Sequence, residues 1–114
     1  MDSFAIGKIR VHRIEEWAGP FAPPSELFAG YEEESWERQR PEFTPDYFDA
    51  PSGKVFGCLQ SWLIDTGTVR ILFDTGAGND KDRPHLPIFG NLQTDFLGRL
   101  AQAGYKPEDI DVVV

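Results

Sequence analysis

Two runs of β-forming residues, separated by a short turn signal, constrain this chain more than any other feature of its sequence. Residues 59–65 and 68–74 are rich in apolar, β-branched and aromatic side chains, and Thr66-Gly67 lies between them. Glycine readily adopts the positive φ that a tight hairpin turn requires, so the two runs are expected to pair as adjacent antiparallel strands. The turn-forming segment Asp74–Asp80 then ends the second strand.

A helix and a further strand are predicted after the hairpin. Apolar residues recur at helical spacing over residues 94–103, with Thr94 as the expected N-cap and Gly104 at the C′ position. Ile110–Val114 ends in three valines, a run typical of a strand that is buried on both faces and reached through a crossover helix. Because a chain-terminal carboxylate is unfavourable on such a strand, we expect the chain to be cut where a larger fold continues.

The N-terminal residues predict a half-exposed first strand. Over residues 8–14, apolar and polar side chains alternate at the strand period, which places Ile9 and Val11 on one face and His12 on the other. Gly19-Pro20 is expected to end this strand. His12 is therefore interpreted as a surface residue.

The segment from residue 20 to residue 51 is rich in proline and in aromatic side chains. It holds six of the nine prolines, which limits regular structure to a short helix within Ser25–Arg40. Ser25 is the expected N-cap, and Glu34 and Arg38 are spaced to pair one helical turn apart. Disordered linkers are poor in aromatic residues, so we expect this segment to pack across another surface.

Charge and composition exclude several classes of protein. The chain has 114 residues with 11 Lys and Arg against 19 Asp and Glu, a net charge of −8, so phosphate backbones would repel it and nucleic acid is not an expected partner. The length allows one domain or part of one. The sequence shows no signal-peptide core or membrane-spanning run, and Cys58 is interpreted as a small buried hydrophobe. A cytoplasmic protein without a membrane partner is expected.

Motifs for nucleotide binding and nucleophilic catalysis are absent from the sequence. Gly76-Ala77-Gly78 lacks the third glycine of G-x-G-x-x-G, because position 81 is Lys. His12 and His85 stand apart, away from any nucleophile elbow, and no H-x-H or C-x-x-C spacing occurs. We therefore expect no catalytic residue and no metal site in this chain, and we interpret Asp80–Arg83 as solvated surface.

Asp74 is the candidate functional acid, since a carboxylate that follows a buried strand and precedes a glycine turn often faces a site at the edge of a sheet. On local mechanics alone, the favoured interpretation is different: the Asp74 side chain caps the turn by accepting a hydrogen bond from the backbone that follows. Aromatic side chains offer a second set of candidates, which could line a pocket or pack in a core. These are Trp17, Phe21, Trp36, Tyr47 and Phe48.

Four segments, taken together and in order, resemble a known fold family. They are Gln60–Gly67 (QSWLIDTG), Ile71–Lys81 (ILFDTGAGNDK), Phe96–Leu100 (FLGRL) and Pro107–Val114 (PEDIDVVV). They resemble the start of a metallo-β-lactamase-fold hydrolase, of the branch that includes lactonase-like and organophosphate-hydrolase-like enzymes. The match covers most of residues 57–114, whereas residues 1–50 resemble the N-terminal region of that branch only loosely.

The resemblance implies an α/β (α+β) fold class, as part of an αββα metallo-β-lactamase sandwich. The complete fold binds two divalent metals, usually zinc, and a metal-bound hydroxide attacks an ester, lactone or phosphoester. In that family the strand matching Ile110–Val114 leads into the metal-ligand motif T-H-x-H-x-D-H, so the chain is expected to be truncated before the motif and to hold no cofactor by itself. Asp74 alone matches a family position near the metals, where its carboxylate supports a ligand or the ligand loop.

The sequence leaves two hypotheses. In the first, the chain is the N-terminal portion of a metal-dependent hydrolase and is inactive alone: residues 1–56 form a strand and a covering segment, and residues 57–114 begin the hydrolase domain. The complete protein would act on a small molecule, the five aromatic candidates would belong to a substrate lid, and the aromatic segment would favour a homodimer. In the second, the chain is a self-contained, small acidic α+β module that binds a protein partner without catalysis.

Overall fold

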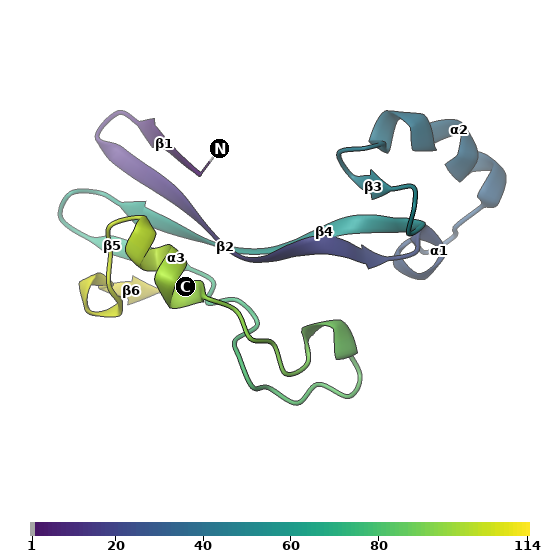
Figure 1. The fold of residues 1–114 in the computed structure, drawn as a ribbon. Helices are drawn as coiled ribbons and strands as arrows, with labels where there is room; N and C mark the ends of the chain where they lie inside the picture. Colours follow the sequence, from purple (N-terminus) through teal and green to yellow (C-terminus); the bar gives the residue numbers. More distant parts are fainter. Residues whose placement is uncertain (1) are drawn as a thin grey trace. The chain divides into compact units, whose positions relative to one another are not determined.

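The computed structural model describes residues 2–114, which form two compact units (Figure 1). Unit 1 comprises the residues up to Trp17 together with Leu59–Val114, and unit 2 comprises Ala18–Cys58. The helices and strands are β1 (Ser3–Ile6), β2 (Ile9–Ala22), α1 (Pro24–Leu27), α2 (Glu33–Phe43), β3 (Phe48–Asp49), β4 (Lys54–Asp65), β5 (Arg70–Phe73), η1 (Pro87–Phe89), α3 (Phe96–Gln102), η2 (Pro107–Asp109) and β6 (Val112–Val113).

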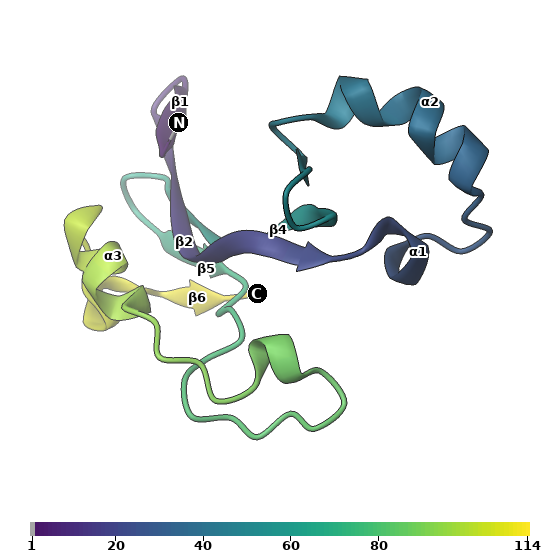
Figure 2. The same ribbon diagram turned by 45° about the vertical axis from the view of Figure 1, so that its right-hand side comes forward.

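The strands of the described residues form one sheet in the order β1-β2-β4-β5-β6, with β3 paired to β4. The predicted hairpin is confirmed: β4 and β5 are antiparallel, and Asp65 lies opposite Arg70. Its loop has four residues rather than two, because the Thr66 hydroxyl bridges the turn. This hydroxyl donates to the Val69 carbonyl and accepts a hydrogen bond from the Val69 N–H. The predicted crossover is also confirmed, since β5 and β6 are parallel, with α3 between them in the sequence (Figure 2).

The hydrophobic core of unit 1 lies where α3 packs on the sheet. Ile14 of β2, Leu63 of β4, Leu72 of β5 and Leu100 of α3 are its buried members. These residues come from three strands and a helix, so burial of their side chains holds the sheet and the helix together. The mixed α and β fold class predicted from the sequence is confirmed.

Two predictions about the C-terminal elements of unit 1 are wrong in detail. The helix begins at Phe96, and its N-cap is Asp95, whose side chain accepts a hydrogen bond from the Gly98 N–H; Thr94 instead bonds to Asn79. The valines of β6 are not buried on both faces, since Val112 is 43% exposed and Val113 is 59% exposed. Within residues 2–114, β6 is an edge strand, which pairs on one side with β5.

Unit 2 differs from its prediction in having two helices where one was expected. Pro23 and Pro24 start the four-residue helix α1, so Ser25 lies inside this helix and is not an N-cap. The chain then leaves the helical conformation before α2 begins at Glu33. The expected Glu34–Arg38 pair does form on α2, with an N–O distance of 3.8 Å.

The first strand and the cysteine also need correction. β2 continues through Gly19-Pro20 to Ala22, and a short strand, β1, precedes it, paired so that Phe4 lies opposite Val11. His12 is half-buried, because its ring packs edge-on against Tyr105 at 5.3 Å. Cys58 is exposed and is therefore not the buried residue that was expected.

Candidate functional site

Asp74 lies at the point where β5 ends and the chain turns. Its backbone has a positive φ of 68°, and its Oδ1 accepts a hydrogen bond of 2.7 Å from the Gly76 N–H. The backbone N–H of Asp74 donates to the carbonyl of Val114 at 2.8 Å. The side chain thus caps the turn, as local mechanics predicted, and the residue joins the end of β5 to the chain beyond β6. Its support of a metal ligand stays a prediction.

Glu16 of β2 holds the loop that follows Asp74. This carboxylate is only 3% exposed, and it accepts hydrogen bonds from the backbone N–H groups of Ala77, at 2.7 Å, and Gly78, at 2.9 Å. The Thr94 hydroxyl approaches the same carboxylate at 3.5 Å. A Cβ at position 76 would overlap the Glu16 carboxylate, and Gly76 has a φ of 74°, so this position requires glycine for two separate reasons.

Arg83 secures the same loop from its other side. Its guanidinium donates to the carbonyl of Ala77 at 2.6 Å and to that of Phe89 at 3.0 Å. The side-chain amide of Asn79 closes the base of the loop, because it donates to the Thr94 carbonyl and accepts from the Thr94 N–H, both at 2.8 Å. Arg83 is therefore a half-buried loop anchor, and interpreting it as solvated surface was wrong.

Sequence reasoning missed Glu16, although a signal for it was present. Residues two apart in a strand share a face, and Glu16 follows Ile14 by two positions in β2. An acid on the face that carries a core isoleucine must find hydrogen-bond donors, because an unpaired buried charge is strongly unfavourable. The glycine-rich segment after β5 supplies those donors.

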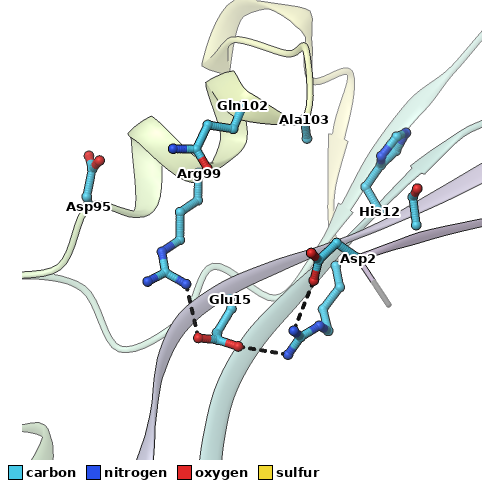
Figure 3. Close-up of a pocket in the computed structure, with 9 residues that line it drawn as sticks. Asp2, His12, Glu15, Asp95, Arg99, Gln102 and Ala103 are labelled. Carbon is cyan, nitrogen blue, oxygen red and sulfur yellow. Dashed lines mark hydrogen bonds and ion pairs between the residues drawn. The ribbon is translucent and has the colours of Figure 1, made fainter.

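A polar cavity of about 760 Å³ lies beside α3 in unit 1 (Figure 3). Glu15 is central to it and binds two guanidinium groups, Arg13 at 2.9 Å and Arg99 at 3.0 Å. Arg13 also reaches Asp2 at 3.0 Å, and this hydrogen bond raises the pKa of the guanidinium. These ion pairs, marked by dashed lines in Figure 3, tie α3 and the N-terminal residues to β2.

A second polar cluster occupies the end of β5 opposite to Asp74. The Tyr105 hydroxyl donates to Asp65 at 2.8 Å and lies 3.5 Å from Nε2 of His12. Hydrogen bonds from the Gly67 N–H and from Tyr105 lower the pKa of Asp65. Burial and the hydrogen bond to Asp65 raise the pKa of Tyr105.

Three of the five aromatic candidates come together in unit 2. Trp36 of α2 packs edge-on against Phe48 at 5.2 Å, and Trp36 and Tyr47 line the same apolar cavity. Phe21 lies on the part of β2 that belongs to unit 2. Trp17 belongs to unit 1, where its ring packs edge-on against Phe89 at 5.8 Å. A role for these residues in a substrate lid stays a prediction.

Residues 2–114 contain neither a group of metal ligands nor a membrane-spanning helix. Within this range, no three His, Cys, Asp or Glu side chains are grouped so that they could hold a metal ion. None of the helices described here has the length and apolar character needed to cross a membrane. The described residues by themselves therefore offer no ligand set for the two zinc ions that the resemblance implies.

Solved structures of two hydrolases and a lactonase have the same fold as this chain. One is the hydrolase AbOPH of the beta-lactamase superfamily, with 22% identity and a TM-score of 0.74. A second is a probable metal-dependent hydrolase from Staphylococcus aureus, with 22% identity and a TM-score of 0.69. A third is AidC, a dizinc quorum-quenching lactonase in complex with the product N-hexnoyl-L-homoserine, with 21% identity and a TM-score of 0.68. The matches cover 97%, 96% and 97% of this chain and 33%, 38% and 33% of those chains. No protein-family model and no curated protein sequence matches the chain.

These likenesses establish the fold of the chain. The resemblance inferred from the four sequence segments is confirmed at this level: the chain has part of a metallo-β-lactamase fold. It spans about a third of the length of the solved structures that it matches.

Proposed function

We propose that this chain forms the N-terminal part of a metal-dependent hydrolase that acts on an ester, a lactone or a phosphoester. One observation carries the proposal: almost the whole chain matches about a third of each of three metallo-β-lactamase-fold hydrolases, in the order of elements that the sequence motifs predicted. In the complete protein, two divalent metals such as zinc would supply a hydroxide for attack on a small-molecule substrate. Their ligands would lie outside residues 2–114, so the chain alone would be inactive.

The part of the proposed site that this chain contributes is the edge of the sheet at Asp74. The hydrogen bond from Asp74 to the Val114 carbonyl brings the end of β5 next to the end of the chain. A ligand-bearing segment that continued from Val114 would therefore start beside the Asp74 carboxylate, which is exposed. The clamp formed by Glu16 and Arg83 would keep this edge fixed while the metals are bound.

The reading frame beyond residue 114 provides the first test. A continuation with a His-x-His-x-Asp-His run is expected, whereas a stop codon directly after Val114 would contradict the proposal and favour the alternative, an acidic protein-binding module. The exposed aromatic side chains of unit 2 are the observation that supports this alternative.

The complete protein provides the second test. We expect it to contain about two metal ions per chain, to hydrolyse ester, lactone or phosphoester substrates, and to lose this activity on chelation and regain it with added zinc. An active protein that contains no metal would contradict the mechanism. Asp74→Asn in the complete protein should lower its metal content, with Asp80→Asn as the control on the same loop.

The aromatic segment is proposed to cover the mouth of the active site or to form a subunit contact in a homodimer. Its proline content and its clustered aromatic side chains support a structured cover. Deletion of residues 20–50 from the complete protein should change its substrate preference, its oligomeric state, or both. If neither changes, this role for the segment is wrong.

We further propose a cytoplasmic location and no membrane partner. We propose no nucleic-acid partner either, in keeping with the net charge of −8.

A further inference from the structure

An apolar cavity of about 230 Å³ lies within unit 2, and aromatic rings make up most of its wall. The lining residues are Phe28, Trp36, Phe43, Tyr47, Val55 and Phe56. The cavity is smaller than the roughly 300–1,000 Å³ of typical sites for drug-sized ligands, so it suits a single compact group.

The walls of this cavity are held by contacts within unit 2. Trp36 stacks on Phe43 at 5.7 Å, and Phe28 packs against the same indole at 6.2 Å. On the other side, backbone hydrogen bonds join Tyr47 to the Phe43 carbonyl and Phe56 to the Tyr47 carbonyl. Beneath them, Phe48 is buried and pairs with Val55 across β3 and β4. The aromatic rings are thus positioned without a ligand.

The unit that contains the cavity carries a net negative charge. Unit 2 has eight acidic and three basic side chains, and two of the bases, Arg38 and Arg40, pair with acids on their own helix. Glu42 and Asp46 make no ion pair among the described residues, and each directly precedes a lining residue in the sequence. Lys54 also directly precedes a lining residue, Val55, so acids outnumber bases two to one at these positions. Loss of hydration and the charges of Glu33 and Glu37 raise the pKa of Tyr31, in keeping with this field.

We propose that the aromatic cavity of unit 2 binds a small organic cation, a substituted ammonium group such as trimethylammonium. The faces of aromatic rings attract cations, and several rings around one site favour an alkylated ammonium, which is both charged and apolar. The neighbouring carboxylates add long-range attraction for positive charge. All residues of this site belong to unit 2, so binding of the cation can be measured separately from hydrolase activity, although Trp36 and Tyr47 also belong to the segment proposed to cover the active site.

The test compares three probes of nearly equal shape on the full 114-residue chain: choline, its neutral isostere 3,3-dimethyl-1-butanol, and the anion 3,3-dimethylbutyrate. Two-dimensional NMR would follow the indole N–H of Trp36 and the backbone of unit 2 during each titration. Choline should bind roughly five- to tenfold more tightly than the neutral isostere, and the anion should bind most weakly. Raising the salt concentration should narrow the difference between choline and the neutral probe.

Two matched pairs of variants locate the site. Tyr47→Ala should weaken choline binding at least threefold, whereas Phe4→Ala, which removes a partly exposed aromatic ring from unit 1, should leave it unchanged. Glu42→Gln should weaken binding of choline but not of the neutral isostere, and Glu108→Gln in unit 1 should affect neither. Because Tyr47 is 64% exposed, its removal should not unfold the chain, which the NMR spectrum itself checks.

Three results would overturn the proposal. Equal affinity for choline and the neutral isostere would make the cavity merely apolar. Stronger binding of the anion would reverse its charge preference. Titration shifts that avoid Trp36 and its neighbours, or no shift with any probe, would mean that the cavity does not bind this class of ligand.

Discussion

The two units of the molecule bury their apolar side chains in different ways. In unit 1, aliphatic residues from four separate elements meet in a closed core, and Leu63 is fully buried. In unit 2, aromatic residues surround an open cavity, and several of them, including Phe28 and Tyr47, are largely exposed. Aliphatic residues at regular strand and helix spacing therefore produce the core, while aromatic residues in a proline-rich segment produce a surface available for binding.

The difference has consequences for stability and for function. A closed core loses both transfer free energy and packing when a side chain is shortened, whereas a half-exposed ring loses much less. Unit 1 is thus expected to determine the stability of the chain, and unit 2 is free to vary its surface. Substitutions in both units can test this division.

The largest effect is expected from Leu63→Ala in the core of unit 1. Removing this fully buried side chain should lower the free energy of unfolding by about 2–5 kcal/mol, measured by urea denaturation. Tyr47→Ala in unit 2 should cost about 0.5 kcal/mol or less. Similar losses for the two variants would contradict the contrast between a closed core and an open aromatic cluster.

A smaller but more specific effect is expected from Gly76→Ala, where the loop meets Glu16. The positive φ of 74° disfavours alanine, and the added Cβ would displace the Glu16 carboxylate, for a total of about 2–4 kcal/mol. Gly78→Ala is the matched control: its φ is 77°, but its Cβ would meet only the Lys81 side chain, at 3.7 Å, so the loss should be about 1–2 kcal/mol. Equal losses in urea denaturation would show that Glu16 does not constrain the loop.

Elements whose signals are local could be predicted from the sequence. The hairpin of β4 and β5, the α3 crossover and the Glu34–Arg38 pair each depend on residues close together in the chain, and all are present. The clamp on the loop after β5 could not be predicted, because Glu16 and Gly78 are 62 positions apart and no local pattern links them. The same holds for His12, whose burial depends on Tyr105 from beyond α3.

The N-cap predicted for α3 was wrong for a different reason. Thr94 and Asp95 are both good N-cap residues, and the choice between them is decided by Asn79, which binds Thr94 from a distant loop. In the candidate site, the capping geometry of Asp74 was foreseen because an Asx turn requires only the residues that follow. Tertiary partners therefore decide what local propensity leaves open.

A pH-dependent effect on the stability of the chain is expected at Asp65, which lies at the end of β5 opposite to Asp74. The pKa of Asp65 is lowered in the folded chain. The ionised carboxylate therefore stabilises the fold at any pH above its ordinary pKa of about 3.9. This stabilisation is lost as the pH falls through the pKa of Asp65 in the folded chain. Asp65→Asn should therefore be less stable than the wild type at pH 7. The gap should begin to narrow below about pH 4 and should close as the pH falls through the folded pKa of Asp65. Tyr105→Phe removes one of the two main hydrogen bonds and should show part of this gap. A gap that does not depend on pH would exclude the carboxylate as its source.

The smallest effect is expected from substitutions in surface ion pairs. Both units contain such pairs, so their contributions to stability can be compared directly. On α2 of unit 2, the Glu34 and Arg38 side chains are 90% and 69% exposed, so Arg38→Ala should change the free energy of unfolding by about 0.5 kcal/mol or less. In unit 1, Arg99 joins α3 to Glu15 of β2 at 3.0 Å, and Glu15 is only 26% exposed. Arg99→Ala should thus cost more than Arg38→Ala, and its cost should be less sensitive to salt, because a partly buried pair is screened less than an exposed one. Urea denaturation of both variants at low and high salt measures this difference, and equal costs would mean that the pair between α3 and β2 acts as an ordinary surface contact.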